Sequence, residues 1–277
     1  MLTVESFRAA KRRILYWLRH DCPYVRGSVH YFGTRLYFPR HSSVAKVISW
    51  GGVFEAENVW FLKRLTSHGG WLFDVGANIG AIALPLLEGN PDTHVVSFEP
   101  SPNSLPFLRR THAGSPYRDR WTIVEKALSD TESSAFFHIG EAGGGAFDGF
   151  ADTARAGPSR KIIVPATTLD SEWARLGRPR VAAIKIDVEG AELGVLAGAR
   201  ECLAAQRPPV LIEWNATNLR AYGRASHTLL DLVKEHGFDV HGVPGLVRAT
   251  DAADLALLML QTESFLLWPS DRHQPLA

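Results

Sequence analysis

Residues 71–80 constrain the fold of this 277-residue chain more than any other stretch. A short apolar run ending in Asp74 predicts a buried strand, and Gly76 and Gly80 predict a turn that leads into a helix over residues 82–87. Glycine lets the backbone pass close to a ligand, and the first amides of a helix offer that ligand hydrogen-bond donors. The sequence therefore predicts a strand, a glycine turn and a helix that together form part of a small-molecule site.

The residues of this turn indicate which ligand it suits. A dinucleotide pyrophosphate calls for the pattern G-x-G-x-x-G and is repelled by a carboxylate at the strand tip. This chain instead has the spacing G-x-x-x-G, with Asp74 as the acidic residue at the tip. S-adenosylmethionine has an ammonium and a sulfonium and no phosphate, so a nearby carboxylate favours it. The motif predicts a methyl donor rather than a nicotinamide dinucleotide.

A second acidic residue follows the next predicted strand. Residues 93–98 are another short apolar run, which ends at Glu99 and Pro100, and Glu99 lies 25 positions after Asp74 (99 − 74). A carboxylate at this place can accept hydrogen bonds from both hydroxyls of an adenosine ribose. Each motif alone is weak, because many glycine turns are only turns and most strand-ending glutamates are solvated. Their order and spacing together predict an adenosine-containing cofactor.

Five stretches of the chain resemble the FkbM family of S-adenosylmethionine-dependent methyltransferases. They are residues 73–80, 97–100, 126–130, 168–170 and 184–192, of which the last is the most specific. The resemblance extends from about Gly51 to Pro269. It implies an α/β class I methyltransferase (Rossmann-like) fold, whose seven-stranded, mostly parallel sheet has a reversed last strand. We therefore expect a methyltransferase domain over residues 51–269, preceded by a helical and hairpin extension over residues 1–50 and followed by a flexible tail over residues 270–277.

The resemblance also implies which residues contact the cofactor. Besides Asp74 and Glu99, these are residues of the glycine turn and of the end of the second strand: Gly76, Ala77, Asn78, Gly80 and Pro100. The backbone near Ala127 and Leu128 is expected to meet the adenine, because small residues suit a flat ring. Glu55 has two interpretations. It is either a first-turn carboxylate favoured by the helix dipole or, by resemblance, a pocket residue.

The catalytic candidates come from residues 184–192. If the chain stays extended through Glu189, the two-residue period of a strand points Lys185, Asp187 and Glu189 to the same side. Ligands of open α/β sheets lie outside the carboxyl ends of the strands, so Asp187 and Glu189 should border the pocket. An internal pair between Lys185 and a carboxylate, which only stabilises the strand end, is the alternative.

A hydroxyl acceptor needs a base that takes its proton during methyl transfer. Asp187, Glu189 and Glu213 are the candidates, and the first two are preferred because they belong to the most specific motif. Asp187 has a second interpretation, in which it faces the methionine ammonium of the cofactor. The sequence leaves open which carboxylate is the base.

We expect an O-methyltransferase that acts on a hydroxyl of a sugar, glycolipid or polyketide-like small molecule, a substrate class that the resemblance supplies. The alternatives are N-methylation of a small molecule, and a cofactor-binding interaction protein of the same fold without transfer activity. Nucleic acid is not an expected partner, because the net charge is only +1. Neither the two cysteines, Cys22 and Cys202, nor the eleven scattered histidines have the spacing of a metal site. No metal ligand is therefore assigned, and the sequence leaves open whether Asp187 and Glu189 bind a divalent ion. The two cysteines fit a reducing cytoplasm.

The first 40 residues carry two further patterns. Residues 4–19 mix apolar and basic side chains in the manner of a basic amphipathic helix, which either packs on the catalytic domain or makes a weak peripheral membrane contact. Residues 21–40 predict a hairpin, whose aromatic side chains are either core residues or the lining of a substrate mouth. No stretch reaches the roughly 20 apolar residues needed to span a bilayer, so a soluble protein is expected.

The remaining elements are predicted from periodicity and turn residues. Helices are expected at residues 56–66, 190–203 and 228–236, and strands at residues 121–124, 136–139, 181–187, 210–215, 238–243 and 264–268. Residues 255–260 fit either a helix or a strand. The glycine-rich residues 140–157 are expected to form a mobile lid over the active site, with disorder as the alternative.

Overall fold

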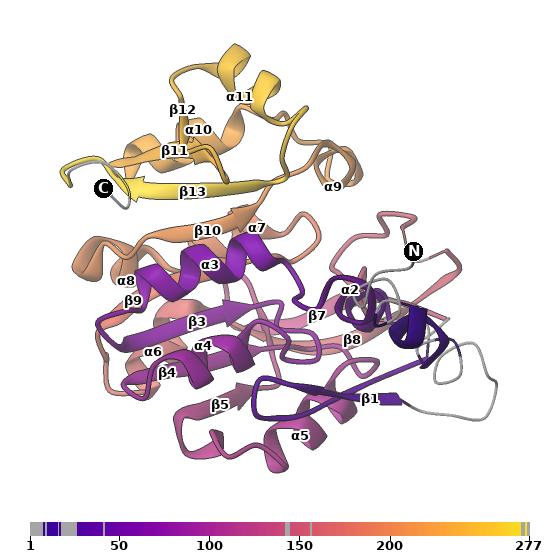
Figure 1. The fold of residues 1–277 in the computed structure, drawn as a ribbon. Coiled ribbons are helices and arrows are strands. Elements are labelled where there is room, and N and C mark those ends of the chain that lie inside the picture. Colours follow the sequence, from indigo (N-terminus) through magenta and orange to yellow (C-terminus); the bar gives the residue numbers. More distant parts are fainter. Residues whose placement is uncertain are drawn as a thin grey trace, which may run out of the picture.

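The computed structural model describes residues 8, 10–15, 17, 27–40, 42–141, 145–155, 157–272 and 275. Its centre is a sheet of eight strands (Figure 1). In spatial order these are β5 (Trp121–Val124), β4 (Thr93–Phe98), β3 (Gly70–Val75), β9 (Val181–Ile186), β10 (Val210–Glu213), β13 (Ser264–Pro269), β11 (Phe238–Gly242) and β12 (Val247–Ala249). The strands from β5 to β10 run parallel, and β13 runs antiparallel to both β10 and β11. The predicted seven-stranded sheet with a reversed last strand is confirmed, and β12 adds an eighth strand at its edge.

Helices cover both faces of this sheet. Successive strand residues point to opposite faces, so Leu72 and Phe73 of β3 belong to two separate apolar clusters. The Leu72 cluster includes side chains of α3 (Ala56–Leu65), α4 (Ala83–Gly89) and α5 (Leu105–Ala113). The Phe73 cluster includes side chains of α6 (Leu169–Arg175), α7 (Glu192–Ala197), α8 (Arg200–Gln206), α9 (Ala216–Ala221), α10 (Thr228–Glu235) and α11 (Ala252–Leu258). Two buried faces explain why the central strands are almost continuously apolar.

The chain reverses its direction across the sheet at β3. From β3 it continues outward to β4 and β5, and it then returns to β9 on the other side of β3. Connections that diverge from two adjacent parallel strands leave a crevice at their carboxyl ends, where ligands of such sheets bind. Gly76, directly after β3, has φ +81°, and a Cβ there would lie 1.8 Å from the carbonyl oxygen of Asp187. The crevice therefore depends on a glycine at this position.

The N-terminal hairpin packs on the same core. It consists of β1 (Gly27–Tyr31) and β2 (Thr34–Phe38), and α2 (Ser43–Gly51) follows it. Tyr31 and Phe38 are buried in the cluster that contains Leu72, so they are core residues and do not line a substrate mouth. The boundary predicted after residue 50 falls within α2. Of the predicted helix over residues 4–19, residues 8, 10–15 and 17 are described, and they are helical.

A second, three-stranded sheet lies beside the carboxyl ends of the main strands. Its order is β6 (Ala127–Leu128), β8 (Ser159–Thr167) and β7 (Ser133–Gly140). The connection from β7 to β8 returns to the sheet through a bridge between His138 and Gly149. Residues 145–155 are thereby held close to the crevice.

Several predicted elements differ from the structure in their bounds, and one that the sequence left open is settled. The single helix expected over residues 190–203 is divided into α7 and α8 at Gly198, where a Cβ would lie 2.1 Å from the carbonyl oxygen of Ser129. The strand expected over residues 181–187 ends at Ile186, and Glu189 and Gly190 have φ +56° and +103°. The assumption that the chain stays extended through Glu189 is therefore wrong. Residues 255–260, which were ambiguous, belong mostly to α11.

No helix within the described ranges is long and apolar enough to cross a membrane.

Candidate active site

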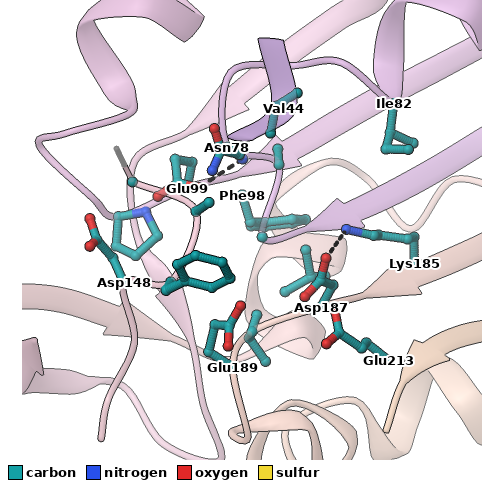
Figure 2. A pocket seen from close by; sticks show the side chains of 18 of the residues that line it. Val44, Asn78, Ile82, Phe98, Glu99, Asp148, Lys185, Asp187, Glu189 and Glu213 are labelled. Carbon is teal, nitrogen blue, oxygen red and sulfur yellow. Dashed lines mark hydrogen bonds and ion pairs between the residues drawn. The ribbon is translucent and has the colours of Figure 1, made fainter. Parts of the chain in front are cut away.

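A pocket lies at the carboxyl ends of β3, β4, β9 and β10 (Figure 2). One side of it, which we call the cofactor half, is formed by the turn after β3, the end of β4 and the short strand β6. Its residues are Gly76, Ala77, Asn78, Glu99, Pro100, Ala127 and Leu128. The other side, the acceptor half, is formed by charged side chains at and after the ends of β9 and β10. Its residues are Lys185, Asp187, Glu189 and Glu213, with Arg155 from the connection between β7 and β8.

Glu99 is the acidic group of the cofactor half. It is 5% exposed, and its two carboxylate oxygens accept hydrogen bonds from the backbone N–H groups of Asn78 (2.8 Å) and Ser101 (2.7 Å). Burial raises the pKa of Glu99 to about 7, against the lowering effect of these two hydrogen bonds. A carboxylate has about four acceptor positions, so those that remain can receive a pair of hydroxyl groups.

Most of the residues predicted for cofactor binding line the pocket. Gly80 does not, and its expected contact is wrong. With φ +87° it turns the chain, and a Cβ there would lie 2.7 Å from the ring of Trp121 and 2.9 Å from Leu108. Gly80 is therefore required for packing between the glycine turn and β5. Glu55 does line the pocket, and it accepts a hydrogen bond from Asn58 Nδ2 at 2.9 Å.

Asp74 is also absent from the pocket surface, which corrects the expectation of a direct polar contact with a ligand. Its side chain is fully buried, and neither of its carboxylate oxygens has a hydrogen-bond partner among the described residues. Asp74 pairs in register with Lys185 on the neighbouring strand β9, so the two side chains lie on the same face of the sheet. Burial raises the pKa of Asp74 to about 6, while the charge of Lys185 opposes that rise. Asp74 thus lies behind the lining of the pocket, where its charge helps to keep Lys185 protonated.

Lys185 and Asp187 form a buried ion pair that borders the pocket. Lys185 Nζ lies 2.9 Å from Asp187 Oδ2, and the side chains are 5% and 19% exposed (Figure 2). Burial opposes the charge on each group, but attraction between them outweighs it. The pKa of Lys185 is raised, with help from Glu55 and Asp74, and the pKa of Asp187 is lowered. The sequence left two alternatives for Asp187, an internal pair with Lys185 and a place at the pocket. The structure shows both, because Asp187 pairs with Lys185 and also lines the pocket.

Glu189 and Glu213 hold their protons more tightly than ordinary carboxylic acids. Burial, followed by the charge of Asp187, raises the pKa of Glu189 to about 8. The same two causes raise the pKa of Glu213, which also shares a hydrogen bond with Asp187. Because Asp187 is kept ionised by Lys185, Glu213 is the partner that carries the shared proton. The acceptor half therefore combines one carboxyl group with a lowered pKa, Asp187, and two with raised pKa values, Glu189 and Glu213.

Arg155 connects the other residues of the acceptor half to the loop that precedes β8. Its Nη1 atom donates to Glu189 Oε2 at 2.8 Å and to Asn218 Oδ1 at 3.3 Å, and it lies 3.7 Å from Glu213 Oε1. Its guanidinium lies 4.4 Å from the ring centroid of Phe147. Sequence reasoning missed Arg155, because nothing in a loop 34 positions before Glu189 indicates that the two side chains meet (189 − 155).

Asp148 is a second pocket residue that the sequence did not indicate. Its carboxylate accepts hydrogen bonds from Ser101 Oγ, from Asn103 Nδ2 (3.0 Å) and from the Gly140 backbone N–H (2.8 Å). These contacts fasten the loop to the segment that follows Glu99. The described part of the predicted lid, residues 145–155, thus forms one side of the pocket, and its closing motion stays a prediction.

The pocket fits S-adenosylmethionine on several observations. The turn at Gly76 leaves a backbone cradle that a Cβ would fill. The buried carboxylate of Glu99 has acceptor positions for a ribose, and Ala127 and Leu128 offer a small apolar surface for a base. Asp187 supplies negative charge for a cationic centre. Within the described part of the chain, no group of three or more histidine, cysteine or acidic residues is placed to hold a metal ion.

The strand order, the glycine turn and the acidic residue that follows β4 are those of a class I methyltransferase fold. The chain belongs to the methyltransferase FkbM domain family, whose model matches residues 74–240. This confirms the resemblance inferred from the sequence and identifies S-adenosylmethionine as the cofactor of the family.

Individual relatives are distant. AMB antimetabolite synthetase AmbE from Pseudomonas aeruginosa is 28% identical over 204 residues, which are 61% of this chain and 9% of AmbE. The 2-O-methyltransferase NoeI from Sinorhizobium fredii is 27% identical over 148 residues, 49% of this chain and 60% of NoeI. The solved structure of methyltransferase FkbM from Methylobacillus flagellatus has a TM-score of 0.45 at 18% identity, and the match covers 72% of this chain and 43% of that one. The chain thus spans less than two thirds of the length of each.

Proposed function

We propose that this chain is an S-adenosylmethionine-dependent O-methyltransferase that acts on a hydroxyl of a sugar, glycolipid or polyketide-like small molecule. The observation that carries the proposal is the position of Glu189, whose pKa of about 8 suits a base, in the same pocket as the ribose carboxylate Glu99. A cytoplasmic location, where the buried free thiol of Cys202 stays reduced, is part of the proposal.

The cofactor half of the pocket acts by alignment. When bound, S-adenosylmethionine supplies a methyl group on a positively charged sulfur. Glu99 would hold the ribose end, and the turn at Gly76 would let the ligand approach the backbone. Holding two reactants in line removes much of the entropic barrier of a bimolecular step.

The acceptor half supplies the base, and Glu189 fits that role best. Asp187 is a weak base, because Lys185 holds its pKa low. The raised pKa of Glu213 makes it a poor base near neutral pH, and its Oε1 atom already accepts a hydrogen bond from Asn215 Nδ2 at 2.6 Å. Glu189 titrates close to neutral pH, where a general base is most effective, and Arg155 fixes its carboxylate in place. Asp187 then serves to orient Lys185 or to face the cationic part of the cofactor.

The substrate class has two supports. The acceptor half presents charged and hydrogen-bonding side chains rather than an apolar wall, which suits an acceptor with several hydroxyl groups. The relative NoeI is named a 2-O-methyltransferase. N-methylation remains the second candidate, because Glu189 could equally take a proton from an amine. A cofactor-binding protein without transfer is the third.

The proposal is tested with isotopically methyl-labelled S-adenosylmethionine and a panel of sugars, glycolipids, polyketide-like alcohols and amines. We expect label in an alcohol acceptor, and product NMR distinguishes an O-methyl from an N-methyl group. Label found only in amines would replace the first candidate by the second. Tight cofactor binding without any transfer across the panel would favour the third.

A further inference from the structure

We propose that the N-terminal helix and α2 together form a docking surface for an anionic lipid membrane. This surface, called the basic-aromatic surface below, combines basic and large apolar side chains that are all exposed. Its members are Arg8, Lys11, Arg12, Arg13, Ile14, Leu15, Trp17, Lys46, Val47 and Trp50. The sequence indicated only the N-terminal helix, and the structure adds α2.

Helix α2 has an apolar side chain on both of its faces. Val44, Ala45 and Ile48 are buried and belong to the core cluster under the sheet. On the opposite face, Val47 is 42% exposed and Trp50 is 52% exposed. A valine and a tryptophan one helical turn apart that are each about half exposed leave apolar area on this face for a partner.

The described residues of the N-terminal helix expose apolar side chains as well. Ile14 is 59% exposed and Trp17 is 58% exposed, so these side chains are not packed into the catalytic domain. The helix nevertheless lies against α2 through Trp50. The Arg13 guanidinium is 5.6 Å from the centroid of the Trp50 ring, and Lys46 Nζ is 4.7 Å from it. The two helices therefore present one joined surface.

The chemistry of this surface selects an anionic membrane as its partner. Residues 8–17 and 42–51 contain basic residues and no acidic residue, although the whole chain has a net charge of only +1. A local excess of positive charge is attracted to anionic headgroups, each basic residue near the surface strengthening binding about fivefold. Tryptophan side chains favour the boundary between headgroups and acyl chains, and aliphatic ones add buried apolar area. A protein partner of mixed charge would not require this one-sided composition.

The surface adjoins the mouth of the pocket. Ser43 and Val44, on α2, line the pocket, and Val44 appears at its edge in Figure 2. Val47 and Trp50 lie on the other face of the same helix, so a chain docked through them holds the pocket one helix diameter, roughly 10 Å, from the headgroups. This step rests on the proposed function, and it narrows the acceptor to a hydroxyl that is presented at a membrane surface, such as the glycan of a glycolipid.

Vesicle flotation tests the docking directly. We expect the 277-residue chain to float with vesicles that contain phosphatidylglycerol, to remain unbound with pure phosphatidylcholine, and to be released by high salt. Trp17→Ser/Trp50→Ser should lower binding at least tenfold, and Lys11→Gln/Arg12→Gln/Lys46→Gln should lower it by about fivefold per charge. The matched control is Leu257→Ser/Leu260→Ser, which removes two leucines that are 62% and 83% exposed in and after α11. It should float like the unsubstituted chain.

Three outcomes would overturn the proposal. The first is a folded chain that ignores anionic vesicles, and the second is an equal loss of binding in the leucine control. The third is self-association that disappears in the Trp17→Ser/Trp50→Ser variant without any vesicle binding, which would assign the surface to a second copy of the chain. Calorimetry with S-adenosylmethionine on the same variants distinguishes failure of the docking proposal from failure of the proposed function. Cofactor binding can stay intact when docking fails, and docking can persist when cofactor binding fails.

Discussion

The two halves of the pocket hold their carboxylates in different ways. In the cofactor half, Glu99 is fixed by the backbone N–H groups of Asn78 and Ser101. In the acceptor half, Glu189 is fixed by the side chain of Arg155, and Asp187 by Lys185. Backbone donors are set by the path of the chain, whereas ion pairs between side chains can separate and form again. The cofactor half is therefore held by the backbone, and the acceptor half is held by contacts between side chains that can be exchanged.

The largest effect is expected on turnover, from a substitution in the acceptor half. Glu189→Gln removes the proposed base, so turnover should fall by about 10²–10⁴-fold. Affinity for S-adenosylmethionine should stay within a few-fold, because Glu99 and the glycine turn are untouched. Steady-state kinetics and calorimetry measure the two quantities separately.

The matched control for this variant is Glu213→Gln. An amide resembles the protonated carboxyl that Glu213 retains, so turnover should fall by less than about tenfold, far below the general-base range. Equal losses of turnover in the two variants would mean that Glu189 has no special role and that the carboxyl groups of the acceptor half act as a unit.

The next effect concerns the place where the two halves meet. Gly76→Ala would put a Cβ 1.8 Å from the carbonyl oxygen of Asp187 at φ +81°, whereas Gly177→Ala has φ +83° and nothing within 4 Å. The left-handed conformation costs about 1–2 kcal/mol in both variants. Gly76→Ala should lose a further 1–3 kcal/mol or so through overpacking. Urea unfolding measures both, and equal losses would show that backbone conformation alone explains the glycine.

A smaller effect tests the buried carboxylate of the cofactor half. The folded-state pKa of Glu99 is about 7, above the value of 4.5 that is usual for a glutamate. A raised pKa gives stability that is present below about pH 4.5 and is lost as the pH rises through about 7. Relative to Glu99→Gln, which cannot ionise, the ligand-free chain should therefore lose about 3 kcal/mol of unfolding free energy between these pH values. A stability difference independent of pH would show that Glu99 is ionised without cost.

The same contrast explains what the sequence could predict. The cofactor half follows from local patterns, because the strand, the glycine turn and the acidic strand end lie within residues 71–100 and each has its own signal. Asp74 and Gly80 were assigned to the ligand because a motif does not tell which way a side chain faces. The register with Lys185 turns Asp74 behind the wall, and the ring of Trp121 occupies the space beside Gly80.

The acceptor half was only partly predictable. Asp187 and Glu189 belong to a recognisable motif, but the strand ends at Ile186 and the backbone at Glu189 has a positive φ, so the two side chains are not related by the period of a strand. Arg155 and Asp148 come from a glycine-rich connection without periodicity. Their partners lie 34 and 47 positions away in sequence, so only the assembled fold brings them to the pocket.

Calorimetric titration of S-adenosylmethionine tests the central claim most directly. The unsubstituted chain should bind the cofactor, and Glu99→Ala should bind at least tenfold more weakly, because charge-assisted hydrogen bonds to the ribose contribute roughly 1.5–3 kcal/mol each. Glu125→Ala, which removes a half-exposed glutamate paired with Arg109 outside the pocket, is the control and should bind normally. Equal affinities for a folded Glu99→Ala chain and the unsubstituted chain would contradict the assignment of this pocket to the cofactor.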